Sequence, residues 1–130
     1  MPIRIVRLGT PRHPDEGLRL GTVRRPPRGV PRSEFASRDY YDVWLPDLAP
    51  SAELLSSVSS QSLTGTQWNR FTREYRKEMH SPATQHLFAL LAAMSAHTNF
   101  SVGCYCADES RCHRSILREL LVDAGAIVTE

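Results

Sequence analysis

The residues of this sequence that are best suited to chemistry lie together in the segment Cys104-Tyr105-Cys106-Ala107-Asp108-Glu109-Ser110-Arg111-Cys112-His113-Arg114. This segment holds all three cysteines of the chain, together with one histidine and two arginines. A thiolate is a nucleophile and a soft metal ligand, an imidazole exchanges protons near neutral pH, and a guanidinium group binds phosphate or carboxylate. Nucleophilic, redox, metal-binding and anion-binding chemistry are therefore the candidates.

Nucleophilic catalysis is the first of these interpretations. A thiol at a helix N-terminus beside arginine has a lowered pKa, so Cys112 or Cys106 is a candidate nucleophile with His113 as its base. A cysteine-phosphatase loop has an arginine six positions after its cysteine. Here Cys112 stands six positions after Cys106, and Ser110 stands six after Cys104, so the spacing disfavours that mechanism.

The same cysteines have other interpretations. Cys104 and Cys106 are two residues apart, so on a strand they share a face, and Cys106 could approach Cys112 or His113. The spacing C-x-C-x5-C-H differs from the usual structural zinc patterns, and we assign no metal site. A redox pair between Cys106 and Cys112 stays open, as does a role for these residues as ordinary buried thiols.

This segment follows a predicted strand and precedes a predicted helix. Residues 100–106 form a compact apolar run that is typical of a strand at the centre of a sheet. Apolar residues then recur at helical spacing, at Ile116, Leu117, Leu120, Leu121 and Ala124. Gly125 is placed for a left-handed C-cap, and residues 127–128 predict a final strand. Strand, helix and strand at this spacing predict a βαβ unit and a mainly parallel sheet.

Residues 106–114 occupy the position where α/β proteins bind ligands. Strands of a parallel sheet end there, and helix N-termini present free backbone N–H groups. We expect Asp108 or Ser110 to cap the helix, and its first turn to contain Arg111, Cys112, His113 and Arg114. Cations are disfavoured at this helix end by about 0.3–1 kcal/mol, so an anionic ligand or nearby carboxylates should offset that cost.

The remaining chain predicts the elements that complete the domain. Strands are expected at residues 3–6 and 18–23, a turn or strand at 39–45, and a surface loop at 56–65. Helices are expected at 52–55 with Ser51 as cap, from Thr66 with an apolar stripe, and from Ser81-Pro82 to about His97. We predict a single α/β domain, residues 1–130, with a small mainly parallel sheet flanked by helices in a Rossmann-like three-layer arrangement.

Length and composition are those of an ordinary globular domain, with 130 residues, 41% hydrophobic and 23% charged. No apolar run approaches the roughly 18 residues of a membrane span, and the start of the chain lacks a signal-peptide pattern. We therefore expect a cytoplasmic protein with reduced thiols and no membrane partner. The cofactor and the oligomeric state are not specified by these features.

Basic residues are concentrated at the amino-terminal end. Residues 1–32 contain eight arginines against Asp15 and Glu16, a net charge of +6, whereas the rest of the chain carries −4. Arg24 and Arg28 flank a proline pair, and they could clamp phosphate or carboxylate or pair with acidic residues. The basic region also provides an alternative function, a non-catalytic nucleic-acid-binding protein whose affinity depends on salt.

These segments together resemble the domain of unknown function 488 family, in its YeaO-like branch. The residues that carry the resemblance are Arg24 and Pro27-Arg28-Gly29, Trp44-Leu45 with Leu48 to Leu54, Phe71 to Tyr75, and Cys106 with Cys112-His113-Arg114. The sequence departs from the family pattern at Val23, where the family has Asp, and at Arg25-Pro26, where it has Leu-Trp. The resemblance implies a compact α/β fold with a shared pocket and no established activity.

Our leading hypothesis is a protein that binds a small anionic or phosphorylated ligand. In this hypothesis the charge of the ligand is held by Arg24, Arg28, Arg111 and Arg114. Any chemistry is performed by Cys112, His113 or Cys106. The hypothesis requires that the amino-terminal arginines and the cysteine-rich turn lie at the same edge of the sheet.

Overall fold

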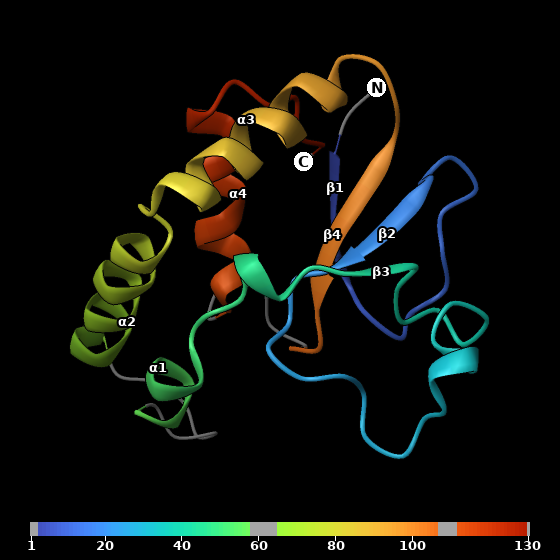
Figure 1. Cartoon of the computed structure of the whole chain (residues 1–130), viewed down its shortest axis with the longest axis horizontal. Coiled ribbons are helices and arrows are strands. Elements are labelled where there is room, and N and C mark those ends of the chain that lie inside the picture. Colours follow the sequence, from blue (N-terminus) through green and yellow to red (C-terminus); the bar gives the residue numbers. More distant parts are fainter. Residues whose placement is uncertain (1–2, 58–64, 107–111, 130) are drawn as a thin grey trace.

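A four-stranded parallel sheet forms the centre of the molecule in the computed structural model, which describes residues 3–57, 65–106 and 112–129 (Figure 1). The strands are β1 (Ile3–Arg7), β2 (Leu18–Gly21), β3 (Val43–Trp44) and β4 (Phe100–Cys104), in the order β1-β4-β2-β3. All three pairings are parallel, as predicted. The strand predicted at 127–128 is reduced to one parallel bridge, between Val128 and Ile3.

The helices begin and end close to where local sequence signals predict. They are α1 (Ala52–Ser56), α2 (Gly65–Glu78), α3 (Pro82–Ser95) and α4 (His113–Asp123), with short 3-10 helices at Arg32–Glu34 and Pro46–Leu48. The Ser51 and Ser81 side chains accept hydrogen bonds from the backbone N–H groups of Leu54 and Thr84, which confirms both predicted N-caps. Gly125 has a φ of +95°, as the predicted left-handed C-cap requires.

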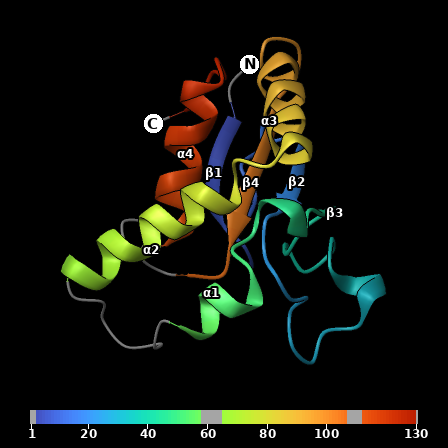
Figure 2. The ribbon, with the colours of Figure 1, turned by 60° about the vertical axis from the view of Figure 1, so that its left-hand side comes forward.

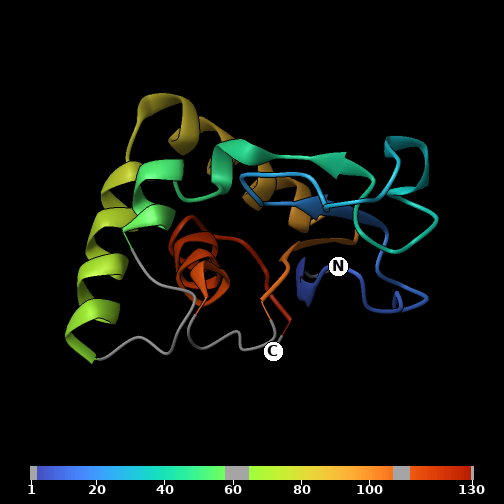
Figure 3. The ribbon, with the colours of Figure 1, turned by 90° about the horizontal axis from the view of Figure 1, so that it is seen from below.

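The long helices pack on one face of the sheet, where the main hydrophobic core lies (Figure 2). Phe100 and Val102 of β4 enter this core together with side chains from α2, α3 and α4. Because side chains alternate along a strand, Ser101 and Gly103 face the other way. In Figure 3 coil from the first third of the chain covers that second face, so the layer opposite the long helices consists of coil and a 3-10 helix.

Close contacts fix two glycines under this coil layer. A Cβ atom on Gly103 would lie 2.6 Å from the Val6 carbonyl oxygen, and one on Gly21 would lie 2.3 Å from the Tyr41 ring. Both positions therefore require glycine, because any side chain would displace the neighbouring strand or the loop that carries Tyr41.

The parallel arrangement brings several chain segments to one edge of the sheet (Figure 1). The strand register pairs Arg7 with Cys104, and Gly21 with Gly103, so β1, β2 and β4 end at the same level. Helix α4 begins at this edge, and its first residue is His113. Within the described residues, no helix is long and apolar enough to span a membrane.

Candidate functional site

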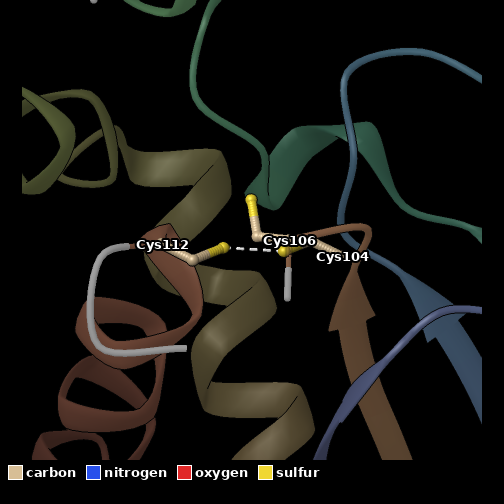
Figure 4. A group of neighbouring side chains, drawn as sticks. All are labelled: Cys104, Cys106 and Cys112. Atoms are coloured by element: carbon tan, nitrogen blue, oxygen red, sulfur yellow. Dashed lines mark hydrogen bonds between the residues drawn. The ribbon is translucent and has the colours of Figure 1, made fainter. Parts of the chain in front are cut away.

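A cluster of three thiols forms at this edge, and we call it the thiol cluster: Cys104, Cys106 and Cys112. Its Sγ atoms all lie within 4.8 Å of one another. Figure 4 shows Cys112 reaching from the start of α4 to Cys104 at the end of β4, with Cys106 on the adjoining coil. The Sγ atoms of Cys104 and Cys112 are 2.7 Å apart, and all three cysteines are free thiols. Cys104 and Cys112 are buried, whereas Cys106 is exposed.

The pKa values of the three thiols are shifted in different directions. Hydrogen bonds from Cys104 and Cys112 lower the pKa of Cys106, and the charge of Arg114 acts in the same direction. The hydrogen bond to Cys106 is the main cause that raises the pKa of Cys104. Bonding to Cys104 lowers the pKa of Cys112, but the bond to Cys106 and burial outweigh it. Cys106, the member that reaches solvent, therefore ionises more readily than the other two thiols.

His113 is buried behind the cluster as a neutral imidazole. Its Nε2 lies 2.8 Å from the Thr22 carbonyl oxygen, which only accepts, so Nε2 carries the proton and donates. The other ring nitrogen, Nδ1, then faces Cys112 Sγ at 3.7 Å. Burial lowers the pKa of His113 to about 4. His113 was predicted to act as a base for Cys112 or Cys106, and the structure places it beside Cys112.

The predicted N-terminus of α4 needs one correction. The N-cap position is Cys112, and its side chain makes no capping hydrogen bond. Cys112 therefore precedes the first turn, which begins at His113. Asp108 and Ser110, the two residues expected to cap the helix, and Arg111 lie outside the described residues.

Two of the arginines expected to bind the ligand contact backbone carbonyl oxygens instead. Arg114 is buried and donates to the Cys106 carbonyl at 2.5 Å, which holds the exposed cysteine near α4. Arg24 donates to the carbonyl oxygens of Pro46, Ala49 and Pro50 at 3.0 to 3.2 Å. Arg24 was expected either to bind an anionic ligand or to pair with a carboxylate. The structure shows it bound to backbone carbonyl oxygens, which is neither of these roles.

Arg28 is exposed and lines a cavity of about 450 Å³. We call this cavity the arginine cavity; its lining residues are Arg25, Pro26, Pro27, Arg28, Tyr40 and Tyr105. Tyr105 stands between Cys104 and Cys106 in the chain, and its hydroxyl donates to the Arg25 carbonyl oxygen at 2.8 Å. The guanidinium groups of Arg25 and Arg28 make no hydrogen bond or ion pair with the described residues.

A second cavity of about 520 Å³ shares Pro26 and Pro27 with the arginine cavity. It contains Arg32 and Tyr41, and the buried Tyr41 hydroxyl has no hydrogen-bond partner within the described part of the chain. A buried hydroxyl without a partner is costly, so this group is available to a ligand. Residues 39–45 were recognised as an aromatic stretch in the sequence. However, the placement of Tyr40 and Tyr41 depends on distant segments.

The thiol cluster is also the one group of metal-type ligands found among the described residues. Three thiolates would leave a tetrahedral zinc ion with one open position. Two sulfurs bound to the same zinc at about 2.3 Å would lie roughly 3.8 Å apart. The 2.7 Å between Cys104 Sγ and Cys112 Sγ is much shorter, so these two thiols would have to separate to hold a metal.

The basic amino-terminal region does not present all of its charge to solvent. Arg19 is buried in an ion pair with Glu16, and Arg12 pairs with Asp39 and Asp42. Arg24 is held by carbonyl oxygens, as described above. The contiguous cationic surface that a nucleic-acid interface would use is therefore interrupted.

Comparison with known proteins identifies the family. No curated protein and no solved structure matches the chain. One family model does match, described as the active DUF488-N3 subclade and named DUF488-N3a, and it spans residues 3–125. That span contains β1 to β4, α1 to α4, the thiol cluster and the arginine cavity. The chain therefore belongs to the DUF488 family.

Proposed function

We propose that this protein is a thiol-dependent enzyme that binds a small anionic ligand in the arginine cavity and attacks it with Cys106. One observation carries the proposal. An exposed thiol with a lowered pKa, Cys106, lies beside two buried thiols at the carboxyl edge of a parallel sheet, and its neighbour Tyr105 forms a wall of a cavity with two arginines. The matched model is described as an active subclade, which supports a chemical role for this edge.

Each residue has a separate task in this proposal. Cys106 supplies the nucleophile, and the thiols of Cys104 and Cys112 stabilise its negative charge by hydrogen bonding. Arg114 positions Cys106 through its carbonyl oxygen. Arg25 and Arg28 attract the anionic group of the ligand, since their guanidinium groups are exposed beside the cavity. Of the four arginines predicted to bind the ligand, this proposal keeps Arg28 and adds Arg25, while Arg111 lies outside the described residues.

The nucleophile is tested by measuring how fast each cysteine reacts with iodoacetamide as pH is varied. A stabilised thiolate reacts at about pH 6 nearly as fast as at about pH 8, whereas an ordinary thiol with a pKa near 8.5 slows by about a hundredfold. We expect the pH-independent reaction at Cys106 in the wild type. A Cys104→Ala variant, which removes one of the hydrogen-bond donors beside Cys106, should restore part of the pH dependence. Ordinary pH dependence at Cys106 in the wild type would overturn the assignment.

The cavity is tested by binding of AMP, a probe with a dianionic phosphate and an aromatic ring. Calorimetry on the wild type, Arg28→Gln and Lys77→Gln separates a local contact from net charge, because both variants lose one exposed cation. We expect Arg28→Gln to weaken binding by about tenfold, the loss of one charged hydrogen bond, with Lys77→Gln unchanged. Equal effects of the two substitutions would contradict binding in the cavity.

A further inference from the structure

We infer that the thiol cluster is a dithiol–disulfide relay, in which Cys106 attacks a small anionic disulfide and a Cys104–Cys112 disulfide stores the oxidising equivalents. This inference rests on the proposed role of Cys106 as nucleophile and adds to it a substrate class and a fate for the electrons. It arises from the division of the cluster into one exposed thiol and two buried ones that are already in contact.

The arrangement of the sulfur atoms supports a relay. Cys106 is the cluster member that a solvent-borne substrate reaches, since Cys104 and Cys112 are only 2% and 3% exposed. Both buried sulfurs lie within 4.8 Å of Cys106 Sγ. A disulfide formed on Cys106 therefore has two neighbouring thiols able to attack it with small side-chain movements.

The buried pair is the expected end point. Cys104 Sγ and Cys112 Sγ lie 2.7 Å apart, about 0.7 Å more than the length of a disulfide bond. Cys104 is held at the end of β4 and Cys112 at the N-cap of α4, so two rigid elements keep the sulfurs together. A disulfide between them is shielded from solvent, which protects it from exogenous thiols.

The reaction then has three balanced steps. In the first, the Cys106 thiolate attacks one sulfur of the substrate RSSR, forming a mixed disulfide and releasing RS⁻. In the second, Cys112 loses its proton through His113 Nδ1 to the medium and attacks Cys106 Sγ, and the second RS⁻ leaves. In the third, Cys104 gives up its proton to the medium and attacks Cys112 Sγ, and Cys106 is released as a thiolate. The two released protons convert both RS⁻ ions into RSH. The net change converts RSSR and two thiols into two RSH and one Cys104–Cys112 disulfide, a transfer of two electrons.

Neighbouring groups assist the second step and select the substrate. His113 Nδ1 is unprotonated and lies 3.7 Å from Cys112 Sγ, so it is the nearest acceptor for the proton that Cys112 loses. Arg25 and Arg28 line the cavity beside Tyr105 and favour a substrate that carries carboxylates. Low-molecular-weight disulfides with acidic groups fit the site for two reasons. They contain a bond that a thiolate can attack, and they carry negative charge that the two arginines attract.

Glutathione disulfide is the probe for the experiment. Fully reduced wild-type protein is mixed with it, quenched by acid at intervals, alkylated, digested and mapped by mass spectrometry. We expect a transient glutathione adduct on Cys106, followed by a Cys104–Cys112 link and an alkylatable Cys106. In the double variant Cys104→Ala with Cys112→Ser both neighbouring thiols are absent, so the adduct should persist on Cys106. In Cys106→Ser the oxidation of the buried pair should slow by about tenfold or more, because the entry thiol is lost.

Charge selection is measured by repeating the reaction with the uncharged disulfide of 2-mercaptoethanol. Arg28→Gln should slow the reaction with glutathione disulfide several-fold relative to the uncharged disulfide, and Lys77→Gln should leave the ratio unchanged. Equal slowing with both disulfides would overturn the anionic substrate class.

The outcomes separate the relay from the nucleophile on which it depends. If Cys106 alkylation is independent of pH but the wild type stops at a stable adduct or at a Cys106–Cys112 link, the relay is wrong and the nucleophile stands. If Cys106 alkylation has the pH dependence of an ordinary thiol, both proposals fail together.

Discussion

Two polar clusters lie on the same strand, β4, and they differ in how completely their charged groups are paired. Towards the start of β4, Ser101 donates to Glu16, and Arg19 donates to the same carboxylate at 2.7 and 2.9 Å. All three side chains are at most 2% exposed. At the end of β4, Cys104 belongs to the thiol cluster, whose member with a lowered pKa, Cys106, is exposed.

The difference lies in whether the charge has a complete set of partners. Arg19 Nη1 also donates to the carbonyl oxygens of Thr10 and Asp39, so four of its five N–H groups have partners and the first cluster is largely closed. In the thiol cluster the partners are weak thiol donors and one side of the thiolate reaches solvent. A buried charge with every partner present stabilises a fold, whereas an exposed charge with incomplete partners is available for reaction.

The largest expected effect is on the closed cluster. Arg19→Met leaves the buried Glu16 carboxylate without its cation, which should lower the free energy of unfolding by about 3–5 kcal/mol. By comparison, Cys104→Ala removes a small buried side chain and should cost about 1–2 kcal/mol. Urea unfolding of both variants, analysed with a common m-value, measures the two differences directly.

A double variant tests whether the loss arises from the unpaired charge. In Arg19→Met with Glu16→Gln neither group is charged, so the cost should fall below the sum of the two single substitutions. If Arg19→Met costs less than Cys104→Ala, the contrast between a closed structural cluster and an open reactive one does not hold.

The second prediction concerns His113, which lies between the thiol cluster and β2. Its pKa is lowered to about 4 by burial, whereas the imidazole in the unfolded chain titrates near 6.5. Between these values the unfolded chain binds a proton that the folded chain excludes, so acidification from about pH 6.5 to 4 should destabilise the protein by roughly 3 kcal/mol.

Chemical unfolding at a series of pH values measures this slope. His113→Gln can still donate to the Thr22 carbonyl oxygen but does not titrate, so its stability between about pH 6.5 and 5 should depend less on pH than that of the wild type. Glu16 and Asp42 also destabilise the fold in acid, because their pKa values are lowered, but they act mainly below about pH 4.5. Parallel slopes for wild type and variant would show that His113 is protonated in the folded state.

The parts of this contrast that the sequence predicts are those that depend on interactions between residues close together in the chain. Helices α2 and α3, strand β4 and the caps at Ser51 and Ser81 follow from local periodicity and local hydrogen bonding, and they were predicted. The clustering of cysteines was also visible, because the sequence placed them within one strand-to-helix connection. The structure brings the three sulfur atoms within 4.8 Å of one another.

The roles of individual arginines could not be read from the sequence. Arg19 and Arg24 appear as members of one basic region, yet one binds a buried carboxylate and the other three carbonyl oxygens. Those partners are chosen by loop positions that no local pattern encodes. The arginine cavity has the same origin, since its walls come from residues 25–28, Tyr40 and Tyr105.

The third prediction is that Arg24, like Arg19, contributes to the stability of the fold. Although it follows β2 near the thiol cluster, it cross-links the segment from Pro46 to Pro50 by three hydrogen bonds. Arg24→Lys keeps the charge but cannot reproduce the planar fork, and we expect a loss of about 1–3 kcal/mol in the free energy of unfolding. A ligand-binding role would instead lower AMP affinity and leave unfolding unchanged.

The smallest expected change in stability comes from Cys106 itself, the residue on which the reactive side of the comparison depends. Its side chain is exposed, so Cys106→Ser should alter the free energy of unfolding by no more than about 0.5 kcal/mol. The same substitution should abolish the pH-independent alkylation and slow the reaction with glutathione disulfide by about tenfold or more, because a serine hydroxyl is not ionised near neutral pH. The hydrogen bond from Arg114 goes to the backbone carbonyl of residue 106 and is retained. A loss of stability as large as that of Arg19→Met would place Cys106 in the closed class, since its charge would then be part of what holds β4 against α4.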